Sequence, residues 1–445
     1  MKLSERDFQR AKATYLAALA KDPMDFAARN DLGLLLWNAG KRQEAFELFL
    51  DAVKRHPNNA TAHANLAFMF LRGGALAEAR TLYEAALRLD PQHAEAKRGL
   101  AAVLAQSGAS AGDVRTAAGS DNAVSVIPYR GSGRPARILL LVSLGSGNVH
   151  IEKLLDDRTF EVTKVVVELF DPAMPLPAHD LIFNAIGDAD SCGDALLAAQ
   201  RLVANEPSVL NHPERVLATT RLATAERLGS VPGATAAKVS RVARAALAQA
   251  GAPPPVEARQ FAFPLLLRAP GHHTGHHFER VDRAADLAPT AARLPGDELY
   301  LLDYIDFASP DGKYRKYRVM FVGARLYPLH LAISHHWKVH YFSAQMADYP
   351  ENRAEDRAFL EDMPSALGPQ AVATLERIAQ TLGLDYAGID FALNPDGNII
   401  VFEANATMVV VDPADDERWS YRREPVRNVT GAVRKMILDA MSWPA

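Results

Sequence analysis

The sequence predicts a multidomain protein in which an all-α helical-repeat solenoid precedes an α/β layer and a larger α+β region. Three observations support this prediction. The first quarter of the chain repeats with a period of 34 residues. Residues 136–233 alternate short apolar runs with helical segments, which is typical of a parallel sheet. Residues 263–405 contain strand-like runs separated by turn residues, which is typical of antiparallel strands.

Composition limits the classes of protein that fit. The chain has 445 residues and a net charge of −4, which gives no support for a nucleic-acid-binding protein. Its single cysteine, Cys192, excludes an intramolecular disulfide and indicates a reducing compartment. Charged residues stand at the start, where a signal peptide needs an apolar run, and no uncharged apolar stretch is long enough to span a membrane. We therefore expect a cytoplasmic protein without a membrane segment.

The N-terminal repeat is defined by residues of one type that recur every 34 positions. Small, aromatic and turn-forming residues all follow this period, as in Ala45 and Ala79, Phe49 and Tyr83, Gly40, Gly74 and Gly108, and Pro23, Pro57 and Pro91. Two amphipathic helices in each period resemble the tetratricopeptide repeat. We expect complete repeats at 26–59 and 60–93, a lone second helix before them (5–21) and a lone first helix after them (94–107).

Stacked repeats present a concave face that suits a peptide or a protein surface. The candidates for that face are Asn30, Leu34, Trp37, Asn65 and Phe68. Two alternatives remain open: the aromatic residues pack against neighbouring helices, or the repeats only join copies of the protein.

The sequence predicts four segments. They are a repeat domain (1–108), a linker (109–135), an α/β domain (136–215) and an α+β domain (216–445). Ala, Gly and Ser dominate the start of the linker, so we expect a flexible tether there. Residues 236–250 are predicted to form a helix. Gly145-Ser146-Gly147 follows the first strand of the α/β domain; a plain turn is favoured over a phosphate loop, because the full glycine fingerprint is absent.

A hairpin over residues 388–405 carries the strongest chemical signal. Its strands flank the turn Asp396-Gly397, with Asp390 on the first strand and Glu403 and Asn405 on the second. Residues two apart project from one face of a strand, and the fold of the hairpin brings Asp390 back beside them. Hard oxygen ligands of these types suit Mg²⁺ that also contacts phosphates. The alternative is a surface hairpin with ordinary polar positions.

Cations stand on two other predicted strands. Lys316 and Arg318 share one face of a strand and become functional if that face lines the cleft of the hairpin. Arg268 ends another strand, and a glycine-spaced loop with four histidines follows it. Its N–H groups and imidazoles are predicted to close over phosphates, in preference to a zinc site; the residues concerned are Gly271, His272, His273 and Gly275.

A loop after the antiparallel strands is rich in titratable and aromatic side chains. We expect it to contact the second substrate, although a surface loop with a half-buried tryptophan is the alternative. The residues are His335, His336, Trp337 and Lys338 of the loop, together with His330 on the strand before it.

Residues of about 136–445, some 70% of the chain, resemble the ATP-grasp superfamily, and within it glutathione-synthetase-like and ribosomal-protein-modifying amino-acid ligases. The segments that carry the resemblance are 211–213, 264–268, 317–319 and 388–405. The resemblance implies an α/β pre-ATP-grasp domain and an α+β ATP-grasp domain that grips ATP between two lobes. It also implies transfer of the γ-phosphate to a carboxylate, followed by attack of an amine on the acyl phosphate.

The resemblance assigns roles to particular residues. Asp390, Glu403 and Asn405 would hold Mg²⁺, and Arg318, with Lys316 beside it, would stabilise the transferring phosphoryl group. The backbone around Leu301 and Tyr304, together with Asp303, would contact adenine and ribose. Arg221 and Arg268 stand where the family commonly has phosphate-binding lysines, which leaves room for an altered nucleotide pose or a pseudoenzyme.

The sequence therefore favours an ATP-dependent carboxylate–amine ligase whose repeats recruit a peptide or protein substrate. The alternatives are a ligase for small amino acids and amines whose repeats serve assembly, and a non-catalytic nucleotide-binding scaffold. A homo-oligomer is compatible with the resemblance, since many relatives are dimers or tetramers.

Overall fold

The computed structural model describes residues 5–119, 122–145, 147–248, 256–271, 275, 277–341 and 344–443. The chain divides into two compact units. The first comprises Met1–Ser125 with Lys164–Pro175, and the second comprises Val126–Thr163 with Leu176–Ala445. None of the helices in these described ranges has the length and apolar character needed to cross a membrane.

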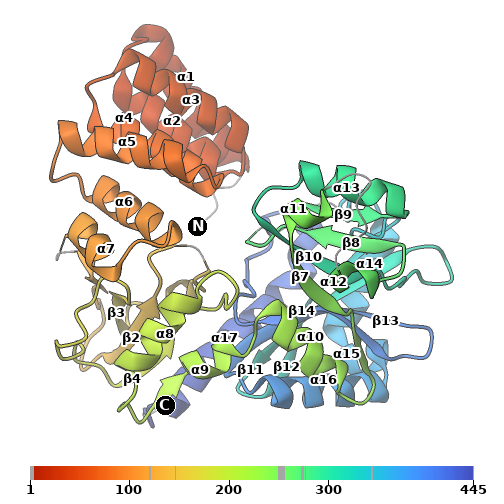
Figure 1. The fold of residues 1–445 in the computed structure, drawn as a ribbon. Coiled ribbons are helices and arrows are strands. Elements are labelled where there is room, and N and C mark those ends of the chain that lie inside the picture. The colour runs from red at the N-terminus through yellow and green to blue at the C-terminus, as the bar shows by residue number, and fades with distance from the viewer. Residues whose placement is uncertain are drawn as a thin grey trace. The chain divides into compact units, whose positions relative to one another are not determined.

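The first unit is built from helices that each pack against the next (Figure 1). They are α1 (Glu5–Lys21), α2 (Phe26–Asn38), α3 (Arg42–Arg55), α4 (Ala60–Arg72), α5 (Leu76–Leu89), α6 (Ala94–Gln106) and α7 (Ala111–Ala118). Ala45, Ala79, Phe49 and Tyr83 are buried, as their recurrence in the sequence predicted. Gly40, Gly74 and Gly108 adopt positive φ at the turns, a conformation that glycine adopts without steric cost.

The prediction of a flexible linker over residues 109–135 is wrong, because this range contains α7 and the strand β1 (Val124–Ile127). The side chain of Ser110 caps α7 by accepting a hydrogen bond from the Asp113 amide at 3.2 Å. Val114 and Ala118 are buried. The helix α6 is therefore not a lone helix, since α7 packs against it. The sequence concealed α7 because Asp113 and Ala117 stand one period after Ala79 and Tyr83, so the markers of the repeat are missing.

Close packing between α5 and α6 gives a first testable prediction. A Cβ added at Gly99 would overlap the buried ring of Tyr83. We expect Gly99→Ala to lower the free energy of unfolding by about 1–3 kcal/mol, because overpacking displaces buried side chains. The control is Gly112→Ala in α7, whose Cβ meets only the Ser110 Oγ at 3.6 Å. Urea unfolding followed by circular dichroism measures both; equal stability of the two variants would contradict this account.

An α/β layer opens the second unit. Its sheet has the order β1-β3-β2-β4-β5, and β4 pairs in parallel with both β2 and β5, as the alternation of strands and helices predicted. The remaining strands are β2 (Ala136–Val142), β3 (Phe160–Val166), β4 (Leu181–Asn184) and β5 (Val209–Leu210). The helices are η2 (Ile151–Leu154), α8 (Gly193–Leu202) and α9 (Pro213–Leu217).

Two further sheets follow. The four-stranded antiparallel sheet has the order β7-β10-β8-β9, and the five-stranded sheet has the order β12-β11-β13-β14-β6. The strands of the first are β7 (Val239–Ala243), β8 (Leu265–Arg268), β9 (Phe278–Val281) and β10 (Glu298–Asp303), with helices α11 (Arg244–Leu247), α12 (Val256–Arg259) and α13 (Ala284–Arg293). The strands of the second are β6 (Ala234–Ala236), β11 (Tyr314–Val322), β12 (Arg325–Ser334), β13 (Tyr386–Leu393) and β14 (Ile399–Asn405). Its helices are α10 (Arg221–Gly229), α14 (Pro350–Glu361), α15 (Met363–Leu367), α16 (Pro369–Leu382), η3 (Glu417–Arg422) and α17 (Arg423–Ala440).

The prediction of a helix over residues 236–250 is wrong. Its described part contains the end of β6, the strand β7 and the short helix α11. An alanine-rich composition favours a helix locally, but β7 lies along β10, which provides its backbone with hydrogen-bond partners. Tertiary pairing therefore overrides the local preference.

The α/β layer and the five-stranded sheet share one hydrophobic core. Val426, Val429 and Val433 of α17 pack with side chains from both sheets in this core. Asn211 strengthens the connection: its side chain accepts a hydrogen bond from the Tyr386 amide and donates one to the Tyr386 carbonyl, both at 2.8 Å. These contacts fix the start of β13, the strand that carries Asp390.

Candidate active site

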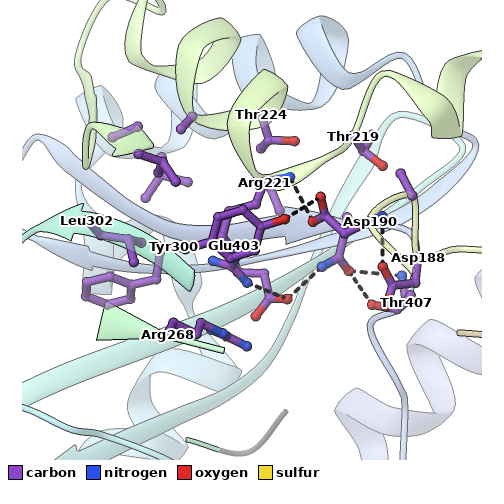
Figure 2. A pocket seen from close by; sticks show the side chains of 18 of the residues that line it. Asp188, Asp190, Thr219, Arg221, Thr224, Arg268, Tyr300, Leu302, Glu403 and Thr407 are labelled. Atoms are coloured by element: carbon purple, nitrogen blue, oxygen red, sulfur yellow. Dashed lines mark hydrogen bonds and ion pairs between the residues drawn. The ribbon is translucent and has the colours of Figure 1, made fainter. Parts of the chain in front are cut away.

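A pocket that opens to solvent lies in the second unit (Figure 2); the empty space in and at its mouth, open solvent included, is about 780 Å³. It is lined by the loop after β4, the start of α10, the end of β8, the strand β10 and the end of β14. Apolar lining comes from Ala236, Ala237, Val239 and Leu302, and charged lining comes from Asp188, Asp190, Arg221, Arg268 and Glu403. The lining therefore combines apolar side chains with charged ones.

The loop after β4 supplies two carboxylates to the pocket. Asp190 accepts hydrogen bonds from the Tyr300 hydroxyl at 3.0 Å and from the Arg221 amide at 2.9 Å, so it connects β10 to the first turn of α10. Burial and the carboxylate of Asp190 raise the pKa of Tyr300 to about 12, which keeps its hydroxyl a donor. Gly187 approaches the residue after β14 so closely that a Cβ there would lie 2.8 Å from the Ala406 backbone.

The end of β14 faces the same pocket. The Asn405 amide donates a hydrogen bond to the Glu403 carboxylate at 2.9 Å, which confirms that these two side chains share a face. Arg221 lies 3.6 Å from the same carboxylate. Burial and the nearby charge of Arg221 lower the pKa of Arg268 to about 10, so the Arg268 guanidinium remains charged at neutral pH. Carboxylates and guanidiniums therefore lie together in the lining of the pocket.

Asp390 lies one strand away from Glu403, directly across the β13–β14 pairing, as the hairpin predicted. It is only 3% exposed and is absent from the described lining of the pocket. Its carboxylate accepts bidentate hydrogen bonds from Arg318 at 2.6 and 2.8 Å and a third from Lys316 at 3.0 Å. Burial opposes ionisation, but Arg318 and Lys316 hold the pKa of Asp390 well below its usual range. Lys316 and Arg318 do share a face of β11, as predicted.

A second buried polar group lies behind Arg318. His330 is the cross-strand neighbour of Arg318, and its ring packs 4.5 Å from that of Tyr341. Burial, Arg318 and Arg422 lower the pKa of His330 well below its usual value, so it is neutral at pH 7. Arg422 donates a hydrogen bond to the Tyr341 hydroxyl at 2.5 Å, and its guanidinium lies 4.0 Å from the carboxylate of the fully buried Asp356.

Asp356 gives a prediction for the pH dependence of stability. Burial raises its folded-state pKa to about 6, despite the opposing charge of Arg422, from a model-peptide value of 3.8. The folded state therefore binds the proton more tightly, and stability contributed by this group falls as pH rises from about 4 to about 6. Relative to Asp356→Asn, the wild-type free energy of unfolding should fall by up to about 3 kcal/mol across that window. Urea titrations at several pH values measure the difference; parallel pH profiles would refute the assignment.

The side chains of the residues expected around adenine and ribose lie outside the described lining of the pocket, whereas their neighbours line it. The side chain of Leu301 is fully buried in the hydrophobic cluster on the opposite face of β10, because residues of a strand alternate between faces. Its neighbours Tyr300 and Leu302 line the pocket instead. Asp303 and Tyr304 are half-buried and lie outside the described lining, and the Arg280 guanidinium stacks 4.2 Å from the Tyr304 ring.

The predicted substrate loop divides into two groups. Trp337 packs edge-on against Phe278 at 5.5 Å, and Lys338 donates a hydrogen bond to the Phe278 carbonyl at 2.7 Å, so both residues attach the loop to β9. His335 and His336 are exposed. In the preceding glycine-spaced loop, Gly271 lines the pocket and Gly275 lies near Lys338. His272 and His273 lie outside the described residues.

The donor set fits Mg²⁺ in chemical type, since Asp390, Glu403 and Asn405 offer hard oxygens on neighbouring strands. Within the described ranges no three His, Cys, Asp or Glu side chains gather as a metal-binding group. The Asn405 Oδ1 accepts hydrogen bonds from the Thr407 amide and hydroxyl, and Asp390 is ion-paired. Binding of a cation by all three groups therefore requires these oxygens to exchange their present partners for the ion.

Several pocket residues were missed at the level of sequence, namely Asp188, Asp190, Thr219, Thr224, Tyr300 and Thr407. A signal existed for two of them. Asp188 and Asp190 follow the buried strand β4, and ligands of α/β sheets bind beyond the carboxyl ends of such strands.

Comparison with known proteins supports the first unit most clearly. The tetratricopeptide-repeat family matches residues 2–60, 31–94 and 70–118, so the N-terminal part of the chain consists of these repeats. Among solved structures, the chain is similar to the RimK domain protein ATP-grasp from Sphaerobacter thermophilus DSM 20745. The two share 17% identity with a TM-score of 0.39, over 68% of this chain and 100% of the other. This similarity is too distant to assign a function. No curated protein matches the chain.

Proposed function

We propose that residues 136–445 form an ATP-dependent carboxylate–amine ligase of the ATP-grasp type, with a pre-ATP-grasp domain at 136–215 and an ATP-grasp domain at 216–445. The γ-phosphoryl group of ATP passes to a carboxylate, and an amine then displaces phosphate to form an amide. The repeats recruit the peptide or protein that is modified. One observation carries the proposal: Glu403 and Asn405 share a pocket with Arg221 and Arg268, next to the cluster of Asp390, Lys316 and Arg318.

The pocket offers an apolar end for the base and a charged end for the phosphates. Val239 and Leu302 belong to the apolar end, and Arg221 and Arg268 belong to the charged end. Arginine contacts phosphate oxygens through two parallel hydrogen bonds and stays charged, so it replaces lysine without loss of the anion site. Because burial and Arg221 weaken the protonation of Arg268, a bound phosphate stabilises its charge.

Asp390, Glu403 and Asn405 are the residues that would hold Mg²⁺. The ion would neutralise phosphate charge and orient the polyphosphate. Arg318 then acts on the transferring phosphoryl group, because phosphoryl transfer depends on positioning and charge stabilisation more than on covalent catalysis. Asp390 preorganises Arg318 through two hydrogen bonds, and the same Asp390 carboxylate accepts a hydrogen bond from Lys316. His330 is neutral beside Arg318 and adds no third positive charge.

Titration calorimetry with a non-hydrolysable ATP analogue and Mg²⁺ tests the proposal. We expect magnesium-dependent binding that the double substitution Asp390→Asn, Glu403→Gln weakens by about 100-fold or more, which corresponds to about 2.7 kcal/mol. The matched control is Asp396→Asn, which changes an exposed carboxylate at the turn of the same hairpin and should bind like the wild type.

Two results would contradict the proposal. One is the absence of binding by the unsubstituted protein with its fold verified, which would favour the non-catalytic scaffold. The other is equal affinity of the double variant and the Asp396→Asn control, which would remove the hairpin carboxylates from the site.

A further inference from the structure

The repeats carry an exposed apolar surface on two helices. Leu34 of α2 is 40% exposed and Phe68 of α4 is 37% exposed. The rings of Trp37 and Phe68 meet edge to face, 5.1 Å apart, so they join α2 to α4. Trp37 and Phe68 therefore pack between the helices, and Phe68 also remains exposed.

Two arginines border this surface. The Arg42 guanidinium lies 5.4 Å from the centre of the Trp37 ring. Partial burial and the nearby charge of Arg42 lower the pKa of Arg72 at the end of α4, so the two cations lie close enough to repel each other. Across the described ranges of the chain, neither arginine has an ion-pair partner. We call Leu34, Trp37, Arg42, Phe68 and Arg72 the Trp37 patch.

A pair of carboxamides lies along the same two helices toward their N-terminal ends. The Asn65 amide donates a hydrogen bond to the Asn30 Oδ1 at 2.5 Å, and both side chains are half-buried. Carboxamides donate and accept hydrogen bonds, so they can serve the main chain of an extended segment. Asp31, beside Asn30, places a negative charge near this end of α2, away from the arginines near the C-terminal ends. From the N-terminal toward the C-terminal ends of α2 and α4, this face therefore presents carboxamides, then aromatic rings, then cations.

We propose that the Trp37 patch binds an extended acidic segment of a partner protein, in which a large apolar side chain contacts Phe68 and carboxylates pair with Arg42 and Arg72. That this partner is the substrate rests on the proposed function, whereas the binding itself does not. Charge decides between this partner and a second copy of the chain. The patch contains two cations and no carboxylate, so a symmetric contact of the patch with itself would give Arg42 and Arg72 no opposite charge to pair with, whereas an acidic segment supplies it.

Fluorescence anisotropy with the full-length protein and a labelled synthetic peptide tests the proposal. The probe is a twelve-residue peptide that carries one phenylalanine followed by four aspartates, compared with a version that carries lysines in place of the aspartates. We expect only the acidic peptide to bind, with an affinity that falls as salt rises, because added ions screen exposed charges. Failure of the acidic peptide to bind, or equal binding of the lysine version, would overturn the proposal.

Substitutions in the Trp37 patch test whether the acidic peptide binds there. Arg42→Glu, Arg72→Glu should weaken the acidic peptide by about tenfold or more, or about 1.4 kcal/mol, and Phe68→Ser should weaken it as well. The charge-matched control is Arg80→Glu, Arg88→Glu, which reverses two exposed cations on α5. Equal loss in the patch and control variants would overturn the assignment of the patch.

Two further measurements separate this proposal from its alternatives. Calorimetry with the ATP analogue should give the same affinity for wild type and Arg42→Glu, Arg72→Glu, so a failure of the nucleotide site and a failure of the patch remain distinguishable. Sedimentation at rising protein concentration tests whether the patch instead binds a second copy of the chain. Self-association that Phe68→Ser abolishes would show that the patch binds another copy, which would contradict the acidic partner.

Discussion

The buried ion pair between Asp390 and its two cations is the constraint on which the second unit depends. A carboxylate that is 3% exposed is unstable unless its charge is balanced and its oxygens accept hydrogen bonds. Arg318 and Lys316, two residues apart on β11, meet both needs at 2.6 to 3.0 Å. These ion pairs form only when Arg318 lies opposite Asp390, so they require the observed register of β11 and β13. The ion pairs and the register therefore stabilise each other.

The elements around this cluster support it from both sides. On one side, β14 places Glu403 across from Asp390, and Asn211 holds the start of β13 through the Tyr386 backbone. On the other side, β12 places a neutral His330 across from Arg318, with Arg422 behind it. The pocket, the hairpin and the buried network are therefore structurally connected. A ligand that pairs with Arg318 or Asp390 must change the balance of charge in the whole buried network.

The sequence predicted those features that depend on short-range rules. The turn at Asp396-Gly397 predicted the hairpin and so the proximity of Asp390 to Glu403, and the 34-residue period revealed the repeats. The direct pairing of Asp390 with Glu403 also depends on a register shift between Asp390 and Phe391, which the turn does not encode. Long-range contacts were not predictable: Asp190 and Tyr300 meet across 110 residues of sequence. The helix α7 was missed because it lacks the residues that mark the repeat, and β7 was missed because pairing with β10 overrides its helical composition.

A double-mutant cycle on the buried cluster tests the central claim most directly. Free energies of unfolding would be measured for Asp390→Asn, for Lys316→Met and for the two together. The account predicts a loss of about 3–5 kcal/mol for Asp390→Asn, because two cations lose their counter-ion. It also predicts that the double variant loses at least about 1 kcal/mol less than the sum of the single variants. Additive losses, or an Asp390→Asn variant as stable as the wild type, would show that the charge balance around Asp390 does not hold this unit together.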